Sequence, residues 1–210
     1  MGSRVARQAV ASIWDVGLVN NCTIGTSRSY STPAFTFAGA VLEQATGRTL
    51  KQLLRNELTK PYSLGMRIQF TGASLPKNYE RAVPYTNNND PTSYSDNSWK
   101  VFGGGLETSA YQLARFGWKV LDAQILSVNA RDNRLWTQVN PNQRNGLGWI
   151  IRTRSGRRVA EHDGSWTGTR TYLRVFRDDG LVVAVMSNRR GHTVDDVSVL
   201  TADLANIVLN

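Results

Sequence analysis

The pattern of apolar and polar residues predicts two helices between positions 33 and 61. Pro33 suits a first helical turn, and Gly47 suits the left-handed residue that ends a helix. Between them apolar residues recur at helical spacing, at Phe37, Val41, Leu42 and Ala45. A second helix follows, in which Thr49 and Gln52 form a capping-box pattern and which Pro61 ends. Its apolar stripe consists of Leu50, Leu53, Leu54 and Leu58.

The middle of the chain is polar before a third helix begins. Residues 84–101 are rich in Asn, Asp, Ser, Thr and Pro, which predicts a long surface loop, and such loops often border a site. No phosphate-binding motif follows the glycines at 103–105, so they predict a turn or tight packing. Thr108 or Ser109 then caps a helix. Its core-facing residues are predicted to be Leu113, Phe116 and Val120.

Past residue 145 the pattern changes to strands. Four strands are predicted, at residues 146–152, 157–162, 169–176 and 181–187. A Ser-Gly turn separates the first two and an Asp-Asp-Gly turn the last two, so both pairs should be antiparallel hairpins.

A helix is predicted at the end of the sequence. Thr193 suits its cap, and Asp195 and Asp196 suit the positive end of the helix dipole. Its buried face is predicted to consist of Val197, Leu200, Leu204 and Ile207.

Composition narrows the possible classes of protein. With 210 residues, of which 40% are hydrophobic, the chain is long enough to bury a core. No apolar run is long enough to span a membrane, and charges interrupt the first residues, so neither a membrane span nor an export signal is predicted. Cys22 is the only cysteine, which excludes an internal disulfide and, with two histidines, a Cys/His zinc site.

The net charge of +9 comes mostly from arginine. Such a charge is typical of proteins that bind nucleic acid or anionic surfaces. Here the basic residues are spread among acids and form neither a zinc-finger spacing nor a basic helix, which favours a solvated basic surface. We therefore expect no nucleic-acid partner, and steep salt-dependent binding of DNA or RNA would reveal that alternative.

Common hydrolase motifs are absent from the sequence. There is no G-x-S-x-G nucleophile elbow, no H-E-x-x-H motif and no supported Cys-His pair. His162 or His192 would have to serve a Ser-His-Asp triad, and nothing local favours either. We expect no metal site and no organic cofactor.

Three segments, in this order, carry a resemblance to a known family: residues 26–50 with Tyr-Ser-Thr, residues 96–117 with the triple glycine, and residues 145–188 with His-Asp-Gly. Together they resemble the beta-lactamase-related serine hydrolase family. That family includes DD-peptidases, class C beta-lactamases, esterases and beta-lactamase-like serine peptidases. The resemblance extends from about Gly25 to the end of the chain.

The resemblance implies an α+β fold of the beta-lactamase/DD-peptidase type, an antiparallel sheet flanked by helices, of which this chain is the C-terminal part. Residues 1–28 are then an irregular lead-in, a remnant of the N-terminal half. Residues 29–145 form a helical region with the tyrosine motif and the polar loop. Residues 146–210 form the antiparallel strands and the C-terminal helix.

The tyrosine motif of the family is Tyr-x-Asn, and here it reads Tyr-Ser-Thr. The resemblance implies that Tyr30 relays protons and that Thr32 contacts substrate, with a hydroxyl in place of the usual amide. The family's nucleophile motif, Ser-x-x-Lys, precedes the tyrosine, but none lies ahead of Tyr30. The one Ser-x-x-Lys string, at residues 74–77, lies downstream in a proline-containing loop. We therefore expect the nucleophile to lie on polypeptide outside these residues.

The third motif fits the family's His-x-Gly. On a strand, His162 and Gly164 point to one face, so the histidine can face substrate and the glycine leaves room for it. The resemblance implies that the Ser165 N–H joins the oxyanion hole, and Trp166 is expected at the pocket mouth. Each residue taken singly also fits a packing role, and the joint match favours the catalytic one. Tyr30, His162 and Gly164 should then converge in space.

The sequence therefore predicts a serine hydrolase fragment that acts through an acyl-enzyme on a peptide, amide or ester substrate. Because Thr32 replaces the family's usual asparagine, hydrolysis of a lactam is less favoured than hydrolysis of a peptide, amide or ester. The alternative is a non-catalytic beta-lactamase-like module that binds a ligand or a partner chain. Expected partners are a small-molecule or peptide substrate and the chain's own N-terminal half or another chain.

Overall fold

The computed structural model describes residue 10, residue 23 and residues 26–69, 79–140 and 143–209. It divides into two compact units. The first comprises residues 1–80 and 94–108, and the second comprises residues 81–93 and 109–210. The sequence-based boundary at residue 145 marks the change from helices to strands. The boundaries of the two units instead reflect which residues pack against one another.

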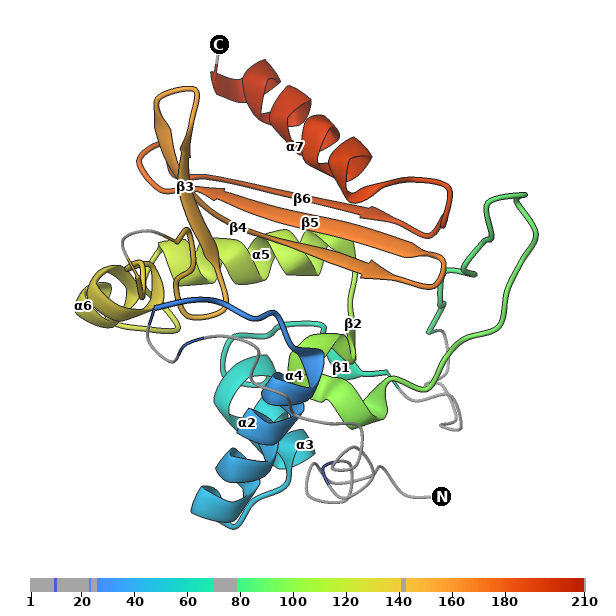
Figure 1. The fold of residues 1–210 in the computed structure, drawn as a ribbon, viewed down its shortest axis with the longest axis horizontal. Coiled ribbons are helices and arrows are strands. Elements are labelled where there is room, and N and C mark those ends of the chain that lie inside the picture. Colours follow the sequence, from blue (N-terminus) through green and yellow to red (C-terminus); the bar gives the residue numbers. More distant parts are fainter. Residues whose placement is uncertain (1–9, 11–22, 24–25, 70–78, 141–142, 210) are drawn as a thin grey trace. The chain divides into compact units, whose positions relative to one another are not determined.

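The first unit is built around one long helix, α2, against which the short helix α4 packs (Figure 1). Its small core consists of Ala40, Leu50, Leu53 and Val101. The elements of this unit are α2 (Thr32–Thr46), α3 (Leu50–Leu53), a π-helix (Leu54–Thr59), β1 (Arg67–Ile68), a 3-10 turn (Ser98–Lys100), α4 (Val101–Gly104) and β2 (Leu106–Glu107). The short strands β1 and β2 pair antiparallel.

The predicted helix ends of this unit are confirmed. Pro33 lies in the first turn of α2, and Gly47 ends the helix with a φ of 66°. The capping box is reciprocal: the Gln52 N–H donates to Thr49 Oγ1 at 3.3 Å, and the Thr49 N–H donates to Gln52 Oε1 at 2.9 Å. One difference is that the second helix changes to π-helical hydrogen bonding over Leu54–Thr59.

The second unit contains a four-stranded antiparallel sheet in the order β3-β4-β5-β6. Four strands and both hairpins form as predicted, but two strands have other bounds. Strand β3 spans Ile150–Arg154 and does not begin at residue 146, because Gly148 has a left-handed φ of 76°. Strand β4 is longer than expected and ends at Trp166. The elements are α5 (Ala110–Leu121), α6 (Val128–Ala130), a π-helix (Arg131–Leu135), β3 (Ile150–Arg154), β4 (Arg157–Trp166), β5 (Thr169–Phe176), β6 (Leu181–Ser187) and α7 (Val194–Leu209). The fold is therefore α+β, with an antiparallel sheet flanked by helices.

Helices α5 and α7 cover opposite faces of this sheet (Figure 1). On the α5 face, Val120 is 2% exposed, and Leu113 and Phe116 pack against the same cluster, which confirms the predicted core side of that helix. Gly117 permits a close approach, because a Cβ there would lie 2.8 Å from Val182 Cγ1. The sheet is thus held from both sides.

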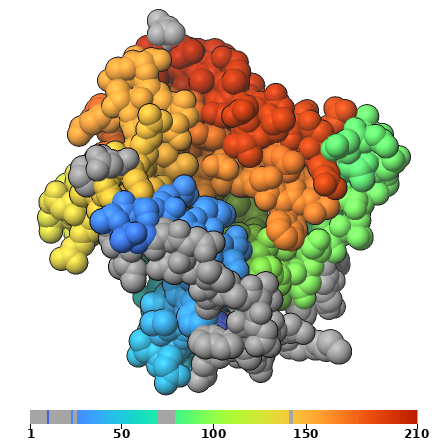
Figure 2. All heavy atoms as spheres, viewed as in Figure 1, coloured from blue at the N-terminus to red at the C-terminus, as the bar shows by residue number. Residues whose placement is uncertain are grey.

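The predicted buried face of α7 is wrong except for Val197. The residues that face the sheet are Val197, Thr201 and Ala205, at a spacing of four, and these small side chains let the helix lie close to the strands. The neighbouring stripe is exposed: Leu200 by 47%, Leu204 by 40% and Ile207 by 78%. Figure 2 shows α7, in red, at the surface beside the orange strands. No described element covers this apolar stripe.

A buried carboxylate ties three strands together on the α7 face. Glu161 is fully buried on β4. It makes ion pairs with Arg152 of β3 at 2.8 Å, Arg154 of β3 at 2.8 Å and Arg174 of β5 at 2.7 Å. Burial alone would raise the pKa of the Glu161 carboxyl, but hydrogen bonds from Arg154 and Arg174 outweigh it, so the pKa lies below its usual value.

Replacing this carboxylate should destabilise the sheet strongly. Glu161→Gln keeps the shape of the side chain but leaves three guanidinium groups without their common counter-charge. We expect the free energy of unfolding in urea to fall by about 3–5 kcal/mol at pH 7.

The matched control is Glu57→Gln, which removes an exposed pair with Arg48 and should cost less than about 1 kcal/mol. The pKa of Glu161 is lowered, so its contribution is complete above its ordinary value and is lost as the pH falls through the folded pKa. Equal effects of the two substitutions would contradict this account of the cluster.

Candidate active site

The His-Asp-Gly motif lies on a part of β4 that has an open edge. Strand β3 pairs with β4 only as far as Glu161, opposite Ile150. Residues 162–166 of β4 continue to pair with β5 on one edge. On the other edge, no strand in the described part of the chain accompanies them. An unpaired edge of this kind offers backbone donors and acceptors to a bound molecule.

The backbone N–H of Ser165 points toward this open edge. The Arg177 N–H donates to the Arg158 carbonyl at 2.9 Å, so the backbone polar groups of Arg158 face β5. These groups alternate between the two edges along a strand, and Ser165 lies an odd number of residues further on. By the same alternation the Asp163 carbonyl also faces the open edge, where His162 Nδ1 lies 2.6 Å from it.

Positions 162 and 164 lie on the α5 face of the sheet, because they follow the core residue Ala160 at intervals of two. His162 is half-buried. Gly164 is opposite Thr171, and a Cβ at position 164 would lie 2.4 Å from Thr171 Oγ1. Close packing against Thr171 therefore favours glycine at this position, in addition to the room that glycine leaves for a substrate.

The tip of the β4–β5 hairpin lies against the polar loop. Trp166 is 45% exposed at the end of β4. Gly168, with a φ of 66°, forms the tight turn, and a Cβ there would lie 2.4 Å from Pro84 Cβ. The loop is also tied to the end of β6, because the Tyr85 N–H donates to the Asn188 carbonyl at 2.8 Å. The loop thus borders the end of β4 that carries the motif.

The tyrosine motif lies at the start of α2 in the first unit. Tyr30 is 64% exposed, with the Arg28 guanidinium 5.5 Å from its ring centroid. Ser31 caps the helix by accepting the Ala34 N–H at 3.2 Å. Thr32 is half-buried, and a Cβ at Gly103 would lie 2.7 Å from its Cγ2. This close contact confirms the tight packing predicted for the glycine run.

Lys100 is a site candidate that the sequence does not reveal. Its side chain is buried, and burial lowers its pKa to about 8. It ends the 3-10 turn that leads into α4, the helix that packs on α2. A lysine with a lowered pKa is suited to proton transfer. Its position inside a stretch predicted to be surface loop hides it from sequence analysis.

A serine–histidine contact occurs in the turn after β6. Ser187 Oγ lies 2.7 Å from His192 Nδ1, and the hydroxyl also accepts the Arg189 N–H at 3.2 Å. Asp196 of the following helix is engaged with Thr193 as a helix cap. This contact is therefore a turn with a Ser-His pair and lacks the orienting acid of a triad.

The predicted site residues fall into two groups. His162, Gly164, Ser165 and Trp166 lie together on β4, and Tyr30 and Thr32 lie together in the first unit. Their convergence stays a prediction. The Ser-x-x-Lys string at residues 74–77 lies outside the described residues. Within the described residues, no helix is long and apolar enough to cross a membrane, and no acidic, histidine or cysteine cluster suits a metal ion.

Comparison with known proteins identifies a family and several similar structures. The family model described as Beta-lactamase matches residues 8–205. A D-stereospecific amidohydrolase from Streptomyces sp. is 25% identical, with a TM-score of 0.73 over 90% of this chain and 58% of that protein. Comparison with curated proteins finds no match.

Two further solved structures share the fold at lower identity. D-amino acid amidase from Ochrobactrum anthropi, complexed with L-phenylalanine, is 16% identical, with a TM-score of 0.77 over all of this chain and 65% of the amidase. An octameric penicillin-binding protein homologue from Pyrococcus abyssi is 18% identical, with a TM-score of 0.78 over 99% of this chain and 48% of that protein. The chain thus spans 48% to 65% of the length of these three proteins.

The packing role of Gly164 can be separated from its role at the open edge. In Gly164→Ala the new Cβ collides with Thr171 Oγ1, and we expect the free energy of unfolding to fall by about 1–3 kcal/mol. Thr171→Ala removes that oxygen and leaves Thr171 Cβ, 3.7 Å from the new atom, at an ordinary contact distance. In this background the same change should cost much less, which a double-mutant cycle in urea measures. Additive effects would contradict the contact.

Proposed function

Because the chain belongs to the beta-lactamase family, we propose that it is the C-terminal part of a serine hydrolase that forms an acyl-enzyme. The observation that carries the proposal is the open edge of β4, where the Ser165 N–H faces outward beside the His-Asp-Gly motif. A substrate carbonyl at this edge would receive a hydrogen bond as negative charge develops on its oxygen. No metal and no organic cofactor enters this mechanism.

The Ser165 N–H acts as one donor of the oxyanion hole. A preorganised donor of this kind typically lowers the barrier by about 3 kcal/mol, because it is aimed at charge that appears only in the transition state. The second donor is the N–H of the nucleophilic serine itself. Gly164 leaves the approach to this position open, and Trp166 at the exposed end of β4 contacts the part of the substrate beyond it.

Tyr30 is the proton relay of the proposed reaction. The serine hydroxyl attacks the carbonyl carbon, its proton passes through the phenol to the leaving amine or alcohol, and the bond to that group breaks. Water then attacks the acyl-enzyme, releasing the acid and returning the proton to serine. Thr32 binds substrate through its hydroxyl at the start of α2, and His162 faces substrate from β4.

The nucleophile is proposed to lie on polypeptide beyond these 210 residues. No Ser-x-x-Lys string precedes Tyr30 in the sequence, and the similar proteins are longer than the part that this chain matches. The substrate is proposed to be a peptide, an amide or an ester. Among these, the amide is favoured by the two similar proteins described as a D-stereospecific amidohydrolase and a D-amino acid amidase.

Two surfaces of the second unit support a polypeptide partner. Strand β6 is the last strand of the sheet, so one of its edges is unpaired among the described strands. The stripe of Leu200, Leu204 and Ile207 on α7 is exposed. Unpaired edges and apolar stripes of this kind bind further chain. We propose that the occupant is the polypeptide that supplies the Ser-x-x-Lys segment.

The alternative function is a non-catalytic module that binds a ligand or a partner chain. The absence of Ser-x-x-Lys ahead of Tyr30 favours it, since a family member without a nucleophile keeps the fold and its cleft but not the reaction.

One experiment separates the two functions. The chain alone should neither hydrolyse an activated ester nor be labelled by a fluorophosphonate. Adding the polypeptide with the Ser-x-x-Lys segment should restore hydrolysis and raise the melting temperature, since whatever binds only the folded state stabilises it. Tyr30→Phe should then reduce kcat/KM by roughly 10²–10⁴-fold, because the relay proton is lost while the ring is kept.

The matched control is Tyr111→Phe, which alters a 71% exposed tyrosine on α5 and should leave hydrolysis unchanged. Labelling of the chain alone at one serine, such as Ser74 or Ser187, would overturn the proposal that the nucleophile lies elsewhere. If the chain alone is monomeric and melts cooperatively, and the added polypeptide changes neither stability nor hydrolysis, the non-catalytic module is the correct function.

A further inference from the structure

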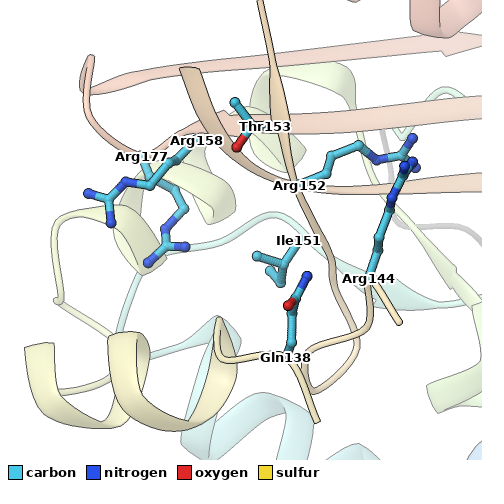
Figure 3. Close-up of a pocket in the computed structure, with 7 residues that line it drawn as sticks. All are labelled: Gln138, Arg144, Ile151, Arg152, Thr153, Arg158 and Arg177. Atoms are coloured by element: carbon cyan, nitrogen blue, oxygen red, sulfur yellow. The ribbon is translucent and has the colours of Figure 1, made fainter. Parts of the chain in front are cut away.

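Four arginines line a pocket in the second unit. The cavity has a volume of about 430 Å³ and lies around Ile151 of β3 (Figure 3). Arg144 and Arg152 lie to one side of Ile151 in this view, and Arg158 and Arg177 lie to the other. Gln138 and Thr153 add polar side chains to the wall. None of the described residues that line this cavity carries a carboxylate.

The side of the pocket that holds Arg158 lies away from the Ser165 end of β4. Arg158 and Ser165 lie seven residues apart on the same strand, β4, which corresponds to about 23 Å at the usual rise of a strand. Both positions belong to the second unit. The proposed hydrolase mechanism therefore uses none of these arginines, and a ligand here does not depend on that mechanism.

The positive charge on one side of the pocket is poorly balanced. Arg152 shares Glu161 with Arg154 and Arg174, and its own 2.8 Å ion pair lacks hydrogen-bond geometry. Arg144 has no carboxylate partner among the described residues, and its side chain is exposed. A bound anion would therefore balance the positive charge on this side of the pocket.

The other side holds two arginines with unequal partners. Arg158 forms an exposed pair with Asp178. The carboxylate nearest to Arg177 is Asp132, at 3.9 Å, and Asp132 is already paired with Arg131 at 2.8 Å. Burial and the charge of Arg158 lower the pKa of the Arg177 guanidinium, in keeping with the long distance to its carboxylate.

Arg177 is nevertheless fixed in position. Its guanidinium lies 5.0 Å from the ring centroid of Trp136, a buried residue that also carries Arg131 at 5.3 Å. An arginine held over an aromatic ring loses little further freedom when it binds an anion, and its planar fork matches the oxygens of carboxylates and phosphates. The pocket thus presents one fixed donor group, that of Arg177, and surplus positive charge.

We propose that this arginine pocket binds a small ligand with two oxyanion groups, one held by Arg144 and Arg152 and the other by Arg158 and Arg177. Ile151 lies between the two pairs, beside the part of the ligand that links the anionic groups. Phosphate and carboxylate groups share the required chemistry, since both accept paired hydrogen bonds from a guanidinium.

The test is titration calorimetry of the purified chain with pyrophosphate and, separately, with succinate at physiological salt. We expect a Kd below about 1 mM for at least one of them, and the better ligand identifies phosphate or carboxylate as the preferred group. Arg144→Gln/Arg158→Gln should weaken that binding at least roughly tenfold. Arg144→Gln alone is the safer variant for folding, because this side chain has no described ion pair, and it should weaken binding by a smaller factor.

The control Arg55→Gln removes an exposed arginine of the first unit and should change the Kd less than about twofold. Three results would overturn the proposal. These are binding of neither ligand, equal weakening by Arg55→Gln and the double variant, or duplex DNA competing with a steep salt dependence that all variants share. The last result would indicate a general basic surface.

Discussion

The candidate site depends on a difference in length between two neighbouring strands. Strand β3 ends its pairing at Ile150, opposite Glu161, whereas β4 continues to Trp166. The continuation is held in place by β5 along one edge only. A backbone that is rigid on one side and unpaired on the other offers fixed hydrogen-bond groups, and these groups need no reorganisation when charge develops on a substrate. If β4 did not extend beyond β3, the Ser165 N–H would form a hydrogen bond with the neighbouring strand.

An ion-pair cluster stabilises β4 at the residue where its extension beyond β3 begins. Glu161 is the last residue of β4 that pairs with β3, and its carboxylate joins Arg152, Arg154 and Arg174. Because the pairs extend to both neighbouring strands, they fix the register at the point where the open edge begins. One of these arginines, Arg152, also lines the pocket for which we propose an anionic ligand.

Much of the fold could be predicted because the determining contacts are local. Capping residues such as Thr49 and Thr193, the stop at Gly47 and the turns between strands act on their own neighbours in sequence. The four strands follow from their apolar patterns. The family could be predicted from three motifs in order, and the family model over residues 8–205 bears it out.

The sequence-based predictions that were wrong or incomplete concern features that depend on residues far apart in the sequence. The α7 stripe of Leu200, Leu204 and Ile207 satisfies a helical pattern, but the close approach to the sheet selects the smaller Thr201 and Ala205. The length of β4 depends on pairing with β5, because Asp163 and Gly164 have low strand propensity. Lys100 and the arginine pocket arise from burial and from residues far apart in sequence, which no local pattern encodes.

We propose that Tyr30 of the first unit and Ser165 of the second serve one acyl-transfer reaction. The most direct measurement is a crystal structure of the protein together with the polypeptide that supplies the nucleophile. The account predicts that Tyr30 Oη and the Ser165 backbone nitrogen each lie about 3 Å from the space for one substrate carbonyl group, and thus within about 6 Å of each other. A structure in which the two atoms lie on opposite sides of the molecule would contradict it.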